Sequence, residues 1–275
     1  MAEDDDRTRP DTGAGPDAPA DGEDAGAAAP ASGEEPLPPA FYVRERRGPL
    51  ADWWAVLHPP YTAWHLSYVL LGAAVSETID LPVLAYTLAA FFLAVGVSAH
   101  ALDEVQGRPL ATGLSDRTLW AVAVIALVLA VGVGGYGLVR VGAWLLPFVV
   151  VGAFLVLAYN LEWFGGRVHT DLGFALAWGA FPALTSAFAQ QGRVSVAAVM
   201  VATGATALSW AQRALSTPVR HVRRRVRSVE IRIVAADGEV SHGDARTLLE
   251  PSERALRTTA WAVVTLGVGL VLARL

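Results

Sequence analysis

The chain has 275 residues, of which 53% are hydrophobic, and these residues are gathered in long blocks. An average soluble domain contains fewer apolar residues, so the lipid bilayer is the first solvent to consider. The chain has no cysteine and all 21 of its basic residues are arginines, which excludes disulfides, cysteine metal sites and any mechanism that needs a lysine Schiff base.

The net charge of −5 averages two different regions of the chain. Residues 1–40 contain 11 acidic and 2 basic residues among many alanines, glycines and prolines. Such a segment has almost no apolar surface to bury, so we expect a disordered acidic tail. It also lacks the basic start and apolar centre of a signal peptide.

Seven apolar segments follow the tail, and most approach the length of about 20 residues that a helix needs to cross the hydrocarbon core. They cover residues 61–76, 82–102, 118–139, 142–160, 172–189, 195–216 and 257–273. We therefore predict an all-α fold, a polytopic membrane bundle of about seven transmembrane helices. The predicted domains are the acidic tail (1–40), the membrane bundle (41–216), an arginine-rich helical region (217–255) and a last transmembrane helix (256–275).

The arginine-rich region reads as a helix, a turn at Asp237-Gly238 and a second helix that begins near the stretch SHGDA. Arginines are concentrated on alternate loops of the predicted bundle: Arg44, Arg46, Arg47, Arg108, Arg117, Arg167 and the stretch RHVRRRVRSVEIR. Because cytoplasmic loops carry the excess of basic residues, we predict an integral cytoplasmic (inner) membrane protein with a cytoplasmic N-terminus.

The second apolar segment runs into the polar stretch HALDEVQGRPL. If the helix continues, His100, Asp103 and Glu104 stand at positions i, i+3 and i+4, on one face. Carboxylate and imidazole groups that converge in this way could bind Mg²⁺, or a transition metal if His100 is a ligand. Arg108 follows one turn later. The alternative is a solvated helix end whose carboxylates pair with Arg108 or Arg117.

The fourth apolar segment ends in AYNLEWFGGRVHTDLG, on the same predicted side of the membrane. Within thirteen residues this stretch gathers Tyr159, Asn160, Glu162, Arg167, His169 and Asp171. Because the two polar stretches share a side, they could close over one metal-bound anionic head group. The alternative is a polar turn with interfacial aromatic residues.

Two further segments carry candidate binding residues. The sixth segment holds Gln212 and Arg213 in its last part, and Arg213 either extends to the lipid headgroups or points into the bundle as an anion ligand. The first segment begins with Tyr61, Trp64 and His65. These side chains are either packing residues or the wall of a cavity for an isoprenoid chain or a cationic intermediate.

These features resemble the intramembrane aromatic prenyltransferases of the UbiA superfamily. The shared features are the polar, acidic end of the second span, the Arg-Pro-Leu that follows it and the tyrosine-containing loop after the fourth span, within residues 50–215. The resemblance implies a helical bundle around a lipid-facing cavity, in which acidic motifs bind Mg²⁺ and a prenyl diphosphate. It implies transfer of the prenyl group, or related chemistry on the diphosphate.

The resemblance and the residues together assign the expected roles. The expected metal ligands are His100, Asp103, Glu104 and Asp171, and the expected catalytic residues are Asp103, Glu104 and Tyr159. The expected substrate-binding residues are Arg108, Arg167, Arg213, Gln212 and Asn160 around the head group and Tyr61, Trp64 and His65 around the prenyl chain.

Three features depart from the family's pattern. His100 stands where the first motif, Asn-Asp-x-x-Asp, has an aspartate, so only Asp103 carries over directly and Glu104 is an added carboxylate. The stretch WAQRALSTPVR holds no acid, although the family has a second acidic motif there. The family typically has nine spans, so the chain resembles a divergent and shortened member.

Three functions therefore stay open. The first is a prenyltransferase-like enzyme that binds a prenyl diphosphate and Mg²⁺ in the lipid bilayer. The second is a non-catalytic isoprenoid- or lipid-binding membrane protein that lacks the second acidic motif. The third is another metal-dependent membrane enzyme, with iron or zinc among the histidines and carboxylates of the two polar stretches. None of them involves nucleic acid, and the oligomeric state is left open.

Overall fold

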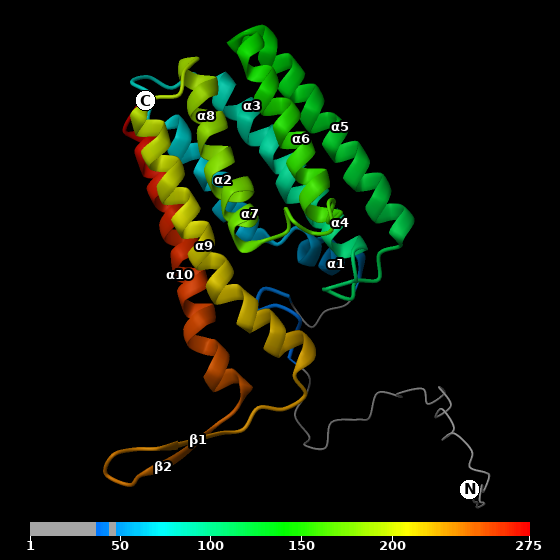
Figure 1. Cartoon of the computed structure of the whole chain (residues 1–275), viewed down its shortest axis with the longest axis vertical. Coiled ribbons are helices and arrows are strands. Elements are labelled where there is room, and N and C mark those ends of the chain that lie inside the picture. Colours follow the sequence, from blue (N-terminus) through cyan, green and yellow to red (C-terminus); the bar gives the residue numbers. More distant parts are fainter. Residues whose placement is uncertain (1–36, 44–47) are drawn as a thin grey trace, which may run out of the picture. The chain divides into compact units, whose positions relative to one another are not determined.

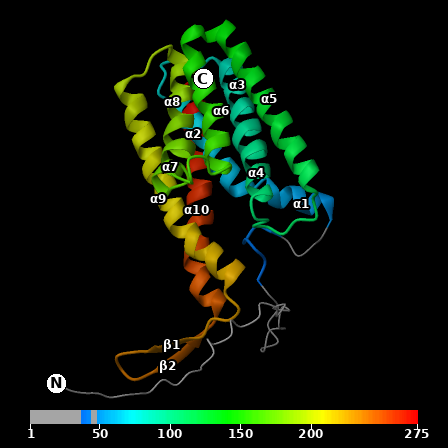
Figure 2. The same ribbon diagram turned by 45° about the vertical axis from the view of Figure 1, so that its right-hand side comes forward.

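The computed structural model describes residues 37–43 and 48–275. Most of the predicted acidic tail, together with Arg44, Arg46 and Arg47, lies outside the described residues. The structure is mostly helical (73%), which agrees with the predicted helical class. Its helices form one bundle, shown from two directions in Figures 1 and 2.

The helical elements are α1 (Pro49–Val56), α2 (Pro59–Ala73), α3 (Leu81–Phe91), η1 (Phe92–Ala99), α4 (His100–Val105), α5 (Asp116–Val141), η2 (Ala143–Leu145), α6 (Leu146–Asn160), α7 (Asp171–Ala175), η3 (Leu176–Ala180), α8 (Phe181–Gln191), α9 (Val196–Arg225) and α10 (Ala245–Leu272). The two strands are β1 (Ile231–Val234) and β2 (Val240–Gly243). The elements α3, η1 and α4 form one continuous helix, and so do α7, η3 and α8.

Five helices are long and apolar enough to cross a membrane: Leu81–Val105, Asp116–Val141, Ala143–Asn160, Asp171–Gln191 and Ala245–Leu272. The protein is therefore a multi-pass membrane protein by the length and composition of its helices. The other two predicted segments overlap α2, which has only 15 residues, and α9, whose second half is rich in arginine. Each of the seven predicted segments thus overlaps a helix.

Side-chain caps and prolines set the starts of these helices. Ser115, Ser195 and Asp244 each accept a hydrogen bond from the backbone N–H three residues later, at the first turns of α5, α9 and α10. Such caps satisfy backbone donors that have no partner inside the helix. Helices α1, α2, α3, α6 and α8 have proline in the first turn, where its missing N–H leaves no bond unmade.

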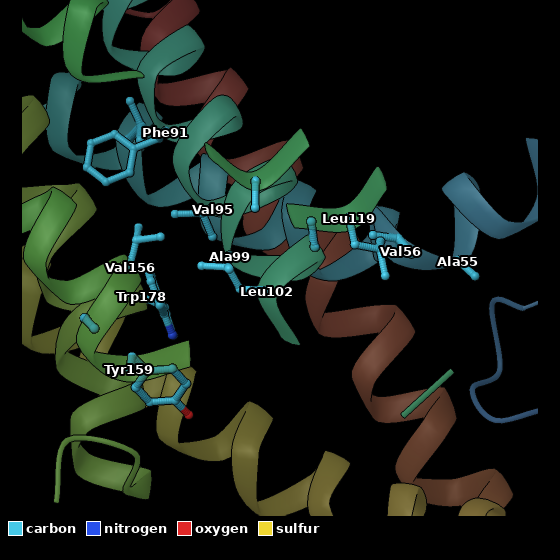
Figure 3. Packing of buried hydrophobic residues seen from close by; sticks show 14 of the residues in the cluster. Ala55, Val56, Phe91, Val95, Ala99, Leu102, Leu119, Val156, Tyr159 and Trp178 are labelled. Atoms are coloured by element: carbon cyan, nitrogen blue, oxygen red, sulfur yellow. The ribbon is translucent and has the colours of Figure 1, made fainter. Parts of the chain in front are cut away.

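Close helix contacts hold the bundle together. Helix α2 lies against both α8 and α10, and a Cβ added at Gly72 of α2 would come within 2.2 Å of the carbonyl oxygen of Ala183. Small residues at such crossings let the backbones approach closely in membrane bundles. The largest apolar cluster includes Phe91, Val156 and Trp178, from three different helices (Figure 3).

The bundle has one end that carries most of the polar residues considered below, and we call it the polar end. Helices α4 and α6 finish there, and α1 and the loop over 161–170 lie there (Figure 1). Helices α9 and α10 extend beyond the other helices at this end and carry the β1–β2 hairpin at their tips (Figures 1 and 2). The C-terminus lies at the opposite end of the bundle.

The structure confirms part of the prediction for residues 217–255 and corrects the rest: the second helix begins within SHGDA as predicted, at Ala245 after the Asp244 cap, but two strands precede it. Helix α9 continues through residue 216 to Arg225, and the next segment forms an antiparallel hairpin in which Ile231 pairs with Gly243 and Val234 with Val240. The turn at Asp237-Gly238 is confirmed, with Gly238 at a φ of 89°. The region before the turn is therefore partly strand, because the apolar residues there alternate with polar ones. Helix α10 crosses residue 256 without a break.

Candidate functional site at the polar end

Two π-helical segments lead to the candidate site. The segment η1 precedes His100 directly, and the imidazole Nδ1 of His100 lies 3.2 Å from the carbonyl oxygen of Gly96 within it. The segment η3 contains Trp178, whose carbonyl oxygen lies 2.9 Å from Nδ1 of His65. π-Helical turns are rare in proteins, and those that occur are often found at functional sites. These two segments therefore make the adjoining residues candidates for a functional site.

The imidazoles of His58 and His100 stack on each other, with ring centroids 4.4 Å apart. His58 joins α1 to α2 in a left-handed conformation, with a φ of 45°, and its Nδ1 lies 2.6 Å from the Tyr42 hydroxyl. Its Nε2 is buried and has no partner among the described residues. Burial lowers the pKa of His58 well below its ordinary value, and the nearby His100 acts in the same direction.

Glu104 is an anchor for the loop that follows α4. Its carboxylate is buried, and it accepts hydrogen bonds from the backbone N–H of Leu110 and from the backbone N–H and hydroxyl of Thr112, at 2.9–3.0 Å. Both carboxylate oxygens are thus engaged with the loop. The predicted role of Glu104 as a metal ligand and catalytic residue does not agree with this placement.

Arg108 also holds this loop. It adopts a left-handed conformation, with a φ of 51°, and its guanidinium donates a 2.5 Å hydrogen bond to the carbonyl oxygen of Leu114 and pairs with Asp116. The guanidinium that was predicted to bind diphosphate is thus engaged with its own loop in this structure. The carboxylate partner is Asp116, from the start of α5, and not one of the acids of α4.

Tyr159 lies at the end of α6 between aromatic neighbours. Its ring stacks on His169 with centroids 4.3 Å apart and meets Trp178 edge-on at 5.6 Å. Its hydroxyl points away from the apolar cluster (Figure 3), is buried, and has no partner among the described residues. The Phe174 ring lies 6.2 Å from the Tyr159 ring and also lies under the guanidinium of Arg213, so this arginine is near the phenol.

Gln212 and Arg213 bring polar groups of α9 to the same region. The Gln212 side chain is buried, with 2% exposure, and its Oε1 has no partner among the described residues. The guanidinium of Arg213 donates a 2.8 Å hydrogen bond to Asp171 and lies over the ring of Phe174, 5.3 Å from its centroid. Arg213 therefore points into the polar end, and Asp171 is its partner and not a free metal ligand.

The remaining predicted residues do not gather around Tyr159 and Arg213. Asn160 donates to the carbonyl oxygen of Val156 in its own helix, and Arg167 is exposed in the loop after α6.

The predicted residues of α2 lie in the interior. Trp64 is fully buried and donates to Tyr68, which in turn accepts from Ser209. His65 is buried against η3, and Tyr61 packs among the aromatic rings of Phe41 and Tyr42. Trp64 and His65 thus take part in interior packing.

The described residues contain no group of three His, Asp or Glu side chains placed to hold a metal ion. Asp103 is half-buried in α4. The predicted ligands Glu104 and Asp171 are already engaged with other partners. The side chains present therefore do not fit the predicted metal site.

Sequence reasoning missed Arg220 and Arg224, which stand 7 and 11 residues after Arg213. This spacing puts the three arginines on one face of α9, so the helical period was the signal that could have found them. It also missed Tyr42 and His58, for which the sequence offers only the break at Pro59-Pro60.

An apolar pocket of about 100 Å³ lies between α3, α5, α6 and α8. Its lining runs from Val83 and Arg140 to Val95, Val156 and Trp178. Trp178 is also the edge-on neighbour of Tyr159. Trp178 therefore contacts both the pocket and the Tyr159 ring.

No family model, curated protein or solved structure matches the chain.

Proposed function

We propose that the chain is an isoprenoid-binding membrane protein that holds the diphosphate head of a prenyl diphosphate at the polar end. The observation that carries the proposal is the buried Tyr159 hydroxyl, which has no partner among the described residues and lies near Arg213, because both residues flank the Phe174 ring. Buried polar atoms nearly always have a partner, so an unpartnered donor close to an arginine indicates a polar ligand. The bundle is then a seven-span relative of the UbiA superfamily, in an inner membrane, with its polar end in the cytoplasm.

Charge at the polar end favours an anionic ligand. Arg213, Arg220 and Arg224 share one face of α9, and guanidinium groups bind phosphate oxygens with two parallel hydrogen bonds. The Tyr159 hydroxyl is a donor for the same oxygens. A diphosphate removed from water needs this compensation, because an unpaired buried charge is strongly unfavourable.

The prenyl chain has an apolar route next to this cluster. Trp178 borders both the Tyr159 ring and the pocket between α3, α5, α6 and α8. A ligand with an anionic head near Tyr159 therefore has apolar surface within reach of its chain. An apolar pocket bordered by a few polar groups is the usual form of a small-molecule site.

The resemblance implies Mg²⁺, but the residues present do not fit a magnesium site. Both oxygens of Glu104 anchor a loop, and Asp171 pairs with Arg213. The arginines, and not a metal, are thus the proposed counter-charges of the diphosphate. Binding that does not depend on Mg²⁺ is the expected result.

A second candidate is an enzyme that transfers the prenyl group, and the position of Asp103 favours it. Asp103 is half-buried in α4, one helical turn after His100. In a transfer reaction the bond between C1 and the diphosphate breaks, the diphosphate leaves with the electron pair, and an acceptor nucleophile bonds to C1 and loses a proton. A half-buried carboxylate is a suitable base for that proton.

The test is binding of farnesyl diphosphate to the purified protein in detergent, measured by calorimetry with and without Mg²⁺. Arg213→Gln and Tyr159→Phe are expected to weaken binding about tenfold or more, since a hydrogen bond to a charged group contributes about 1.5–3 kcal/mol. Arg193→Gln, in the exposed link between α8 and α9 at the opposite end of the bundle, is the matched control and should bind as the parent does. Binding that is absent, or equal in all four proteins, would overturn the proposal. Diphosphate release that Asp103→Asn abolishes would establish the enzymatic candidate.

A further inference from the structure

A short segment of chain, residues 38–42, lies across α9, α10 and the start of α2, and we call it the strap. The guanidinium of Arg223 donates to the carbonyl oxygen of Pro38 at 2.9 Å, and that of Arg224 donates to the carbonyl oxygen of Pro39 at 3.3 Å. The next residue of the strap, Ala40, is buried, with 6% exposure. The strap is therefore docked on the arginine-rich half of α9.

The aromatic residues of the strap complete the docking. The guanidinium of Arg257 in α10 lies 5.4 Å from the ring centroid of Phe41. The Tyr42 hydroxyl forms its 2.6 Å hydrogen bond with His58, and the Tyr42 ring meets Tyr61 edge-on at 5.8 Å. Contacts with three helices thus hold five consecutive residues.

The strap lies over the arginine face of α9. Arg224, which donates to the Pro39 carbonyl oxygen, shares one face of this helix with Arg220 and Arg213. Burial raises the pKa of Tyr42 well above its ordinary value, which shows how closely the strap is packed. The strap therefore covers arginines that the proposed function assigns to the head group.

Two of the arginines under the strap differ in their partners. Arg223 forms a 2.6 Å ion pair with Glu253 of α10, and both side chains are buried. Arg224 has the Pro39 carbonyl oxygen as its hydrogen-bond acceptor, and burial together with the charge of Arg220 lowers its pKa. The Pro39 carbonyl is neutral, so it does not neutralise the charge of Arg224 or of its neighbour Arg220. A phosphate oxygen would, and charge-assisted hydrogen bonds are about twice as strong as neutral ones.

We propose that the strap is an exchangeable cover of the anion site: a diphosphate takes over Arg224 and Arg220, and the strap leaves α9. Arg223 keeps Glu253 in both states, so the surface beneath the strap does not change. The inference rests on the proposed function, because it regulates access to the same site. It adds that binding opens the cover and exposes Ala40, so the ligand and the strap compete.

The test uses the absence of natural cysteines in the chain. In the variant Ala40→Cys, the new thiol is buried while the strap is docked, and its reaction with a water-soluble maleimide reports undocking. Farnesyl diphosphate or inorganic diphosphate, at concentrations that saturate binding, should increase the labelling rate about tenfold or more, since labelling follows the population of the open form. The thiol of Ser241→Cys, in the exposed hairpin, should react rapidly with and without ligand.

Two further measurements separate the outcomes. Tyr42→Phe, introduced beside Ala40→Cys, removes the bond to His58 and should raise the labelling rate without ligand. Hydrogen exchange of the Val43 amide, which donates to the Ala40 carbonyl oxygen at 3.0 Å, follows the strap in the unmodified chain. If calorimetry shows binding while the labelling rate and the hydrogen exchange do not change with ligand, the strap is not a cover of the site and the proposed function stands. If no diphosphate binds, the proposed function and the cover both fall.

Discussion

The imidazole Nδ1 of His65 lies 2.9 Å from the backbone carbonyl oxygen of Trp178, a residue 113 positions later in the chain. A carbonyl oxygen only accepts, so this nitrogen carries the proton and donates. The carbonyl belongs to a π-helical turn, in which the backbone hydrogen bonds depart from the regular α-helical pattern. The contact thus joins α2 to the helix over 171–191.

Replacement of His65 tests this contact. We expect His65→Phe to lower the free energy of unfolding by about 1–3 kcal/mol, because the buried Trp178 carbonyl loses its donor. The measurement is thermal unfolding in detergent, followed by circular dichroism. His65→Gln retains a donor and should recover part of the loss. A His65→Phe protein as stable as the parent would show that the bond does not contribute.

Substitution of Glu104 distinguishes its role as an anchor of the 110–112 loop from the predicted role as a metal ligand. We expect Glu104→Ala to lower the unfolding temperature, since three donors of the 110–112 loop lose a charged acceptor and each such bond contributes about 1.5–3 kcal/mol. Glu104→Gln should lie between Ala and the parent. Farnesyl diphosphate affinity and its response to Mg²⁺ should stay as in the parent. A loss of Mg²⁺-dependent binding without a loss of stability would restore the metal role.

Acidic pH should destabilise the protein through His58. Its pKa is lowered in the folded protein by burial first, and by the charges of His100, Arg224 and Arg220. The unfolded chain, with a pKa of about 6.5, therefore binds more protons than the folded protein below that pH. The stability contributed by neutral His58 is complete above about pH 6.5 and falls as the pH decreases from there.

The measurement is the unfolding temperature in detergent between pH 8 and pH 5. Tyr42→Phe serves as a second variant, because it removes the hydrogen bond to His58 and leaves the imidazole in place. The variant His58→Gln cannot take up a proton, so its stability should depend less on pH than that of the parent. The other five histidines are the same in both proteins. Parallel curves for the parent and His58→Gln would mean that His58 does not titrate on unfolding.

A pair of glycine substitutions tests the contact between α2 and α8. Gly72→Ala places a methyl group within 2.2 Å of the Ala183 carbonyl oxygen, so the helices must separate and the unfolding temperature should fall. Gly132→Ala, in α5, meets open space and should stabilise the protein by about 0.5–1 kcal/mol through helix propensity. If both substitutions have the same effect, the close approach is not required.

The helices could be predicted better than the elements that join them. The apolar segments were visible as blocks, and α5 and α6 match their predictions because long apolar runs have one stable arrangement in lipid. The hairpin was missed although Ile231 and Ile233 alternate with polar residues before Asp237-Gly238, a pattern that favours a hairpin. The density of arginines had favoured a helix there.

The site shows a different limit of sequence reasoning. His100, Asp103 and Glu104 do follow one another on a helix, but the sequence does not reveal that Glu104 turns to the backbone of its own loop. Such partners depend on the path of residues 108–114, which tertiary structure sets. In contrast, the position of Arg213 inside the polar end is one of the two alternatives that the sequence offered.

The length of α9 has an electrostatic consequence. From residue 216, where its predicted membrane segment finishes, the helix rises by about 14 Å to Arg225, at 1.5 Å per residue. The Debye length in physiological salt is about 8 Å, so salt screens charges on the hairpin from lipid phosphates. For a membrane surface at residue 216, the mostly exposed hairpin therefore interacts with soluble molecules without attraction to or repulsion from the lipid headgroups.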